Sequence, residues 1–92
     1  MIDKTKFHIL NFIKKEEYTG SMDGMRYMLR KKDEGMEVVI WPEPYSFGAT
    51  DEALKTYRDF PLTEEGVMEA ADYLNGQYSA QKRLWELSKQ NL

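Results

Sequence analysis

Few side chains in this sequence have the types and spacing that catalysis requires. The chain of 92 residues has no cysteine and a single histidine, His8. A nucleophile and its base would therefore have to involve His8, which on a predicted first helix lies opposite Ile9 and Ile13, towards solvent. Ser21 lies in the stretch GSMDG, which fits neither the G-x-S-x-G nucleophile turn nor the GXXG loop of a KH domain. Its Gly, Ser and Asp residues are typical of a turn.

Carboxylates offer no better site. The pairs Asp51–Glu52 and Glu64–Glu65 are adjacent in the sequence, and adjacent side chains on a helix do not face one another. Both pairs are explained by the preference for negative charge at a helix start. We therefore expect no enzyme, no metal, no cofactor and no small-molecule substrate.

Length and composition predict one domain, residues 1–92, with a small core. No apolar run approaches the roughly 20 residues that span a bilayer, and the polar first residues do not resemble a signal peptide. Without cysteine nothing favours an oxidising compartment. We expect a soluble, cytoplasmic protein that does not enter membranes.

Charge is distributed unevenly along the chain. Residues 1–32 carry eight basic and four acidic side chains, a balance of +4, and the remaining residues carry five and twelve, a balance of −7. Such asymmetry favours steering of a partner or head-to-tail self-association. The net charge of −3 argues against general nucleic-acid binding, which depends on neutralising phosphates.

The first elements are predicted from periodicity and capping. Residues 2–14 are expected to form a helix capped by Asp3, with a strand as the alternative because their aromatic and β-branched residues suit both. Residues 16–24, EEYTGSMDG, have turn chemistry. From Met25 to Trp41 the apolar period changes to two, which predicts a β-hairpin with an inward and an outward face.

The two faces of the hairpin restrict its register. A loop of residues 32–35 makes Leu29 face Val38, whereas a loop of Glu34–Gly35 makes Leu29 face Ile40. The prolines Pro42 and Pro44 should end the second strand.

The second half of the chain completes the predicted fold. Thr50 could cap one helical turn, residues 55–60 are expected to form a third strand, and Thr63 should cap a long final helix. That helix would continue to about Lys89, with a bend or end at Asn75–Gly76 as the alternative. The predicted fold is α+β, with order α-β-β-β-α and a small antiparallel sheet whose two helices pack on one face.

This order of elements resembles the double-stranded RNA-binding domain, in topology alone, because acidic residues occupy the helix start that such domains use on phosphates. The outline is also similar to some phage-encoded inhibitors of CRISPR nucleases. Those proteins imitate nucleic acid with clustered carboxylates, whereas the carboxylates of this sequence are spread along the chain. The stretches YTGSMDGMRY, IWPEPYSF and FPLTEEG resemble short bacterial proteins of unknown function over nearly the whole chain, a likeness that implies no activity.

Two surfaces are predicted to bind a protein partner, either a different protein or a second copy in a homodimer. If Ile40 points inward, Trp41 points outward, beside other side chains of the same hairpin face. The C-terminal half of the last helix adds leucines that lie off its core stripe. The residues predicted to bind protein are Arg26, Met28, Arg30, Val39, Trp41, Leu84 and Leu87.

Each surface has an alternative explanation. The hairpin arginines could be satisfied within the molecule, Arg30 by Glu37 and Arg26 by a cation–π contact with Trp41. The same face, with Lys31 and Lys32, could instead bind single-stranded nucleic acid, although nucleic acid is the less expected partner.

The other aromatic and apolar residues are open to a structural explanation too. The aromatic residues Trp41, Tyr45 and Phe47 could simply close the core, with Phe47 at its open end. Leu84 and Leu87 could pack against the first helix.

Overall fold

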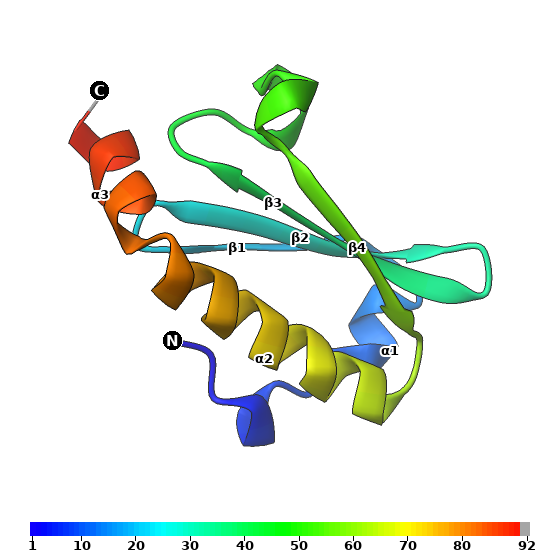
Figure 1. Ribbon diagram of the computed structural model, residues 1–92. Helices are drawn as coiled ribbons and strands as arrows, with labels where there is room; N and C mark the ends of the chain where they lie inside the picture. The colour runs from blue at the N-terminus through cyan, green and yellow to red at the C-terminus, as the bar shows by residue number, and fades with distance from the viewer. Residues whose placement is uncertain (91–92) are drawn as a thin grey trace.

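The computed structural model describes residues 1–90 as an antiparallel sheet with the α-helices on one face (Figure 1). The strands are β1 (Tyr18–Met22), β2 (Met25–Lys32), β3 (Gly35–Pro42) and β4 (Thr56–Pro61), in the spatial order β1-β2-β3-β4. The helices are α1 (Leu10–Ile13), α2 (Glu64–Ala80) and α3 (Lys82–Gln90), with the 3-10 turns η1 (Lys4–Lys6), η2 (Phe47–Ala49) and η3 (Glu52–Leu54). The prediction of a small α+β fold with an antiparallel sheet is confirmed.

The sheet has one strand more than predicted. Residues 18–22 form β1, which pairs with β2 through the two-residue turn Asp23–Gly24. Both turn residues have positive φ, 46° and 104°, as the favoured hairpin turn requires. Gly20 lies in this strand, paired with Tyr27 of β2, and a Cβ at this position would lie 2.6 Å from the Tyr27 hydroxyl. The expected order α-β-β-β-α is therefore wrong, because it lacks the strand β1. The Tyr27 ring occupies the space that is free because Gly20 has no side chain.

The predicted first helix over residues 2–14 is wrong in extent. Asp3 does accept a hydrogen bond from the Thr5 amide, but the turn it caps ends after Lys6, and α1 contains four residues. The segment is held by tertiary contacts instead. Phe7 and Ile13 are both buried in the core, and the Asn75 side chain hydrogen-bonds both the amide and the carbonyl of Ile2, at 2.9 and 2.8 Å. Burial of side chains thus determines this segment more than helix propensity does.

The prediction of one continuous final helix to about Lys89 is wrong, because the helix is interrupted at Gln81, and the alternative break at Asn75–Gly76 is wrong as well. The Thr63 hydroxyl accepts a hydrogen bond from the Gly66 amide at 2.9 Å, which confirms the predicted cap. α2 runs through Asn75–Gly76, and the bend follows at Gln81, whose φ of −126° and ψ of 31° are not helical. The direction of α3 therefore differs from that of α2.

Side chains are buried on both faces of the sheet. The main core lies between the sheet and the helices, where Val67, Ala70, Ala71 and Leu74 on α2 are fully buried. A second, smaller cluster of Met28, Val39 and Trp41 lies on the opposite face, which we call the outer face. The segment with η2 and η3 passes over that side of the sheet (Figure 1).

Candidate interaction surfaces

The outer face of the hairpin has the register of one of the two predicted alternatives. Leu29 pairs with Val38 and Arg26 pairs with Trp41 across β2 and β3. The alternative in which Leu29 faces Ile40 is wrong. The loop is shorter than expected because Lys32 and Gly35 are themselves a pair, and Asp33 adopts a positive φ of 56° in the tight turn.

Trp41 points to the outer face, as its position in the alternation predicts, but the prediction that it is exposed is wrong. Only 3% of Trp41 is exposed, and its neighbours Met28 and Val39 are buried as well. The chain after β3 returns over this face, so that Phe47 packs against Trp41 with ring centroids 5.6 Å apart. The Trp41 indole Nε1 donates a hydrogen bond to the Tyr45 carbonyl at 2.9 Å. Met28, Val39 and Trp41, which were predicted to bind a partner, are therefore buried within a second, smaller core.

Phe47 closes this cluster, on the opposite side of the sheet from the main core. Two cations lie over its ring: the Lys55 ammonium is 3.9 Å and the Arg30 guanidinium carbon 5.2 Å from the ring centroid. The Lys55 side chain is 4% exposed, and its ammonium also pairs with Glu52 at 3.0 Å. Cation–π contacts of this kind contribute more when they are shielded from water. The segment over the outer face is thus fixed by packing and by charge.

Arg30 is satisfied within the molecule, as one alternative predicted. Its Nη2 donates to Glu37 Oε1 at 2.8 Å, and Lys32 Nζ donates to Glu37 Oε2 at 3.0 Å. Glu37 is buried. Burial on its own raises the pKa of Glu37, but the hydrogen bonds and charges of Arg30 and Lys32 outweigh burial and lower that pKa below its usual value. Glu37 is therefore ionised at neutral pH, and both cations are occupied.

Arg26 differs from Arg30. It pairs with Trp41 in the sheet, but the cation–π contacts of residues 1–90 involve Arg30, Lys55 and Arg58 instead, so the expected Arg26–Trp41 contact is not formed. Its Nε is buried without a hydrogen-bond partner. With Trp41 enclosed and Arg30 and Lys32 paired with Glu37, the residues predicted to form a single-strand platform are not free to stack on a base or to meet phosphates.

Leu84 and Leu87 are the predicted binding residues that the structure leaves accessible. They are 43% and 48% exposed, so the alternative in which they pack against the first helix is wrong. α3 is held from its other side, where Trp85 is buried against Gly24 and Lys89 pairs with Asp23 at 2.6 Å. The hydrogen bond from Lys89 lowers the pKa of Asp23. α3 is therefore fixed to the rest of the domain, but Leu84 and Leu87 do not belong to either buried cluster.

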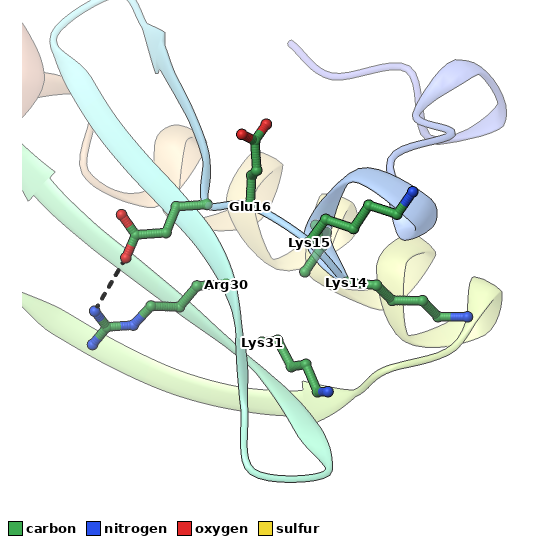
Figure 2. Close-up of a pocket in the computed structure, with 7 residues that line it drawn as sticks. Lys14, Lys15, Glu16, Arg30 and Lys31 are labelled. Carbon is green, nitrogen blue, oxygen red and sulfur yellow. Dashed lines mark ion pairs between the residues drawn. The ribbon is translucent and has the colours of Figure 1, made fainter.

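A second feature of the surface was not predicted. A shallow groove of about 280 Å³ lies between residues 14–17 and the end of β2. Figure 2 shows Lys14 and Lys15 on the segment after α1 and Lys31 on β2, with their ammonium groups extending away from the ion pair that Arg30 forms with Glu17. Sequence reasoning assigned Lys31 to the hairpin and Lys14 to the end of a helix, with Lys15 directly after it, so nothing brought the three together.

Other candidate chemistry is not assembled by the fold. His8 is exposed and lies outside the helices. Within residues 1–90, no three His, Cys, Asp or Glu side chains are grouped so that they could hold a metal ion. In the same part of the chain, no helix has the length and apolar character needed to cross a membrane.

Comparison with known proteins adds no assignment. No protein-family model matches the chain, and neither the curated proteins nor the solved structures with which it was compared include a significant match. The surfaces therefore have to be interpreted from their own geometry.

Proposed function

We propose that the protein is a non-enzymatic interaction domain that associates with a second copy of itself through α3. The observation that carries the proposal is the exposure of Leu84 and Leu87, 43% and 48%, on a helix whose opposite side is fixed to the turn between β1 and β2. A cytoplasmic location is part of the proposal and is supported by the absence of cysteine from the sequence.

The spacing of the exposed residues supports a second copy as the partner. Leu84 and Leu87 lie three residues apart within α3 and therefore share one face of that helix. Such a stripe is self-complementary, since a two-fold axis sets the same residues of two copies against each other. Lys89 and Glu86 lie on other sides of the helix, and Lys89 is already paired with Asp23. Two α3 helices can therefore meet through their leucines with Glu86 and Lys89 outside the contact and Arg83 at its edge.

The size of the contact predicts a weak dimer. The described part of α3 has nine residues, or about 13 Å of helix. Two leucines per copy cannot bury the roughly 1,200 Å² that characterises stable interfaces. We expect a dissociation constant on the order of 100 µM, which corresponds to about 5.5 kcal/mol of binding free energy.

Sedimentation equilibrium or light scattering between about 10 µM and about 1 mM covers this range. The wild-type mass should rise with concentration, and the double variant Leu84→Glu/Leu87→Glu should stay monomeric. Met68→Glu is the matched control, because Met68 is 43% exposed on α2, and it should dimerise like the wild type. A wild type that remains monomeric at about 1 mM would refute self-association, and a monomeric Met68→Glu variant would place the contact elsewhere.

A further inference from the structure

The groove beside β2 is formed by two segments far apart in the sequence. β1 begins at Tyr18, which pairs with Leu29. Residues 30–32 of β2 therefore extend past the end of β1 and have no strand on that side. The chain leaving α1, residues 14–17, passes there without forming one. The result is a concavity of about 280 Å³ above the buried side chain of Ile13.

The lining of the groove has an excess of positive charge. It comprises four cationic side chains, of Lys14, Lys15, Arg30 and Lys31, and two carboxylates, of Glu16 and Glu17. Arg30 Nη1 lies 3.7 Å from Glu17 Oε2, so these two charges offset each other.

The remaining cations are not compensated. Among the ion pairs of residues 1–90, none involves Lys14, Lys15 or Lys31. Glu16 extends away from these three ammonium groups (Figure 2). Each of these three side chains therefore carries a positive charge that a bound anion would offset.

We propose that this groove binds a phosphate-bearing ligand that carries two or more phosphate groups. Lysine ammonium groups bind phosphate as point charges, without requiring the planar geometry that arginine provides. The net lining charge of about +2 favours an anion, and a chain of phosphates can contact both Lys14 and Lys15 on one segment and Lys31 on the other.

The lining also indicates what is not recognised. No aromatic side chain lines the groove, so a nucleobase would find no ring on which to stack. The charged group alone should supply the affinity. Free oligophosphate and the phosphate chain of a nucleotide are therefore equivalent ligands for this site.

The test is a titration of the full chain with tripolyphosphate, followed by ¹H–¹⁵N NMR at low ionic strength. Resonances of residues 14–17 and 30–31 should shift, and the affinity should fall as salt is added. A nucleoside triphosphate should bind within about threefold of tripolyphosphate, since its base has nothing to stack on. Citrate, a tricarboxylate, should bind more weakly. Citrate binding as tight as tripolyphosphate would overturn the assignment to phosphate, and binding of the nucleotide alone would overturn recognition by charge.

A pair of variants separates the site from general electrostatics. Lys14→Gln/Lys31→Gln removes one cation from each side of the groove, whereas Lys82→Gln/Arg83→Gln removes two exposed cations of α3. Each pair changes the net charge from −3 to −5. The first should raise the dissociation constant for tripolyphosphate about tenfold, as expected for two solvent-exposed ion pairs, and the second by less than about twofold. Equal losses in the two variants, or no shift at residues 14–17, would overturn the proposal.

Discussion

Replacement of Trp41 by alanine tests whether the outer face of the sheet is a core or a surface. Trp41 is 3% exposed, and truncation of a buried tryptophan typically costs about 3–5 kcal/mol of the free energy of unfolding. Part of that cost is the hydrogen bond to the Tyr45 carbonyl, worth about 1 kcal/mol. Because domains are stable by only about 5–15 kcal/mol, we expect Trp41→Ala to lower the midpoint of thermal unfolding by about 12 °C or more.

Urea unfolding followed by far-ultraviolet circular dichroism measures this loss, since the readout does not depend on tryptophan fluorescence. Tyr45→Ala is the matched control, because the Tyr45 side chain is 62% exposed and its backbone carbonyl still accepts the indole hydrogen bond. That variant should remain within about 0.5 kcal/mol of the wild type. Trp41→Phe keeps a ring but not the donor, and should lie between the two. A Trp41→Ala variant that costs less than about 1 kcal/mol would refute the enclosed cluster.

Two further predictions concern the buried carboxylate and the glycines. Because the folded-state pKa of Glu37 is lowered, its contribution to stability is fully present above the unfolded pKa of about 4.3 and is lost as the pH falls through the folded value. Urea titrations between about pH 3 and pH 7 should show that Glu37→Gln, destabilised by about 1–3 kcal/mol at pH 7, responds less to acid than the wild type; equal responses would contradict this. Gly24→Ala should destabilise the protein, because its φ of 104° is strained for alanine and a Cβ would collide with the Trp85 carbonyl. At Gly76 a Cβ would meet open space within α2, so Gly76→Ala should raise the free energy of unfolding by about 0.5–1 kcal/mol in the same denaturation assay. A Gly24→Ala variant more stable than Gly76→Ala would contradict this reasoning.

The parts of the fold that sequence predicts well are set by neighbouring residues. The alternation from Met25 to Trp41 determines which side chains share a face, and Thr63 begins α2 because its hydroxyl is placed to accept from Gly66. The strand at Gly20 could not be predicted in this way. Its glycine is explained by the ring of Tyr27 on the next strand, a contact that the local sequence does not indicate.

The candidate sites show the same limit. Periodicity gives the side to which Trp41 points, but what lies over that side depends on the path of residues 43–55. Lys14 and Lys31 are close in space because α1 is short and the chain then passes along β2, whereas a helix over residues 2–14 would have carried Lys14 elsewhere. Leu84 and Leu87 were predicted correctly as off the core stripe, because helical spacing decides that locally.

The position of β3 restricts how this sequence can vary. A strand at a solvated sheet offers every second position for polar substitution, but residues 36–41 of β3 are buried without exception. Met36, Val38 and Ile40 pack in the main core beneath the helices. On the outer face, Glu37 binds Arg30 and Lys32, and Val39 and Trp41 belong to the cluster that Phe47 covers. A strand enclosed on both faces has no side on which mutations can accumulate freely, so variation in this protein should be tolerated at β4 far more readily than at its neighbour.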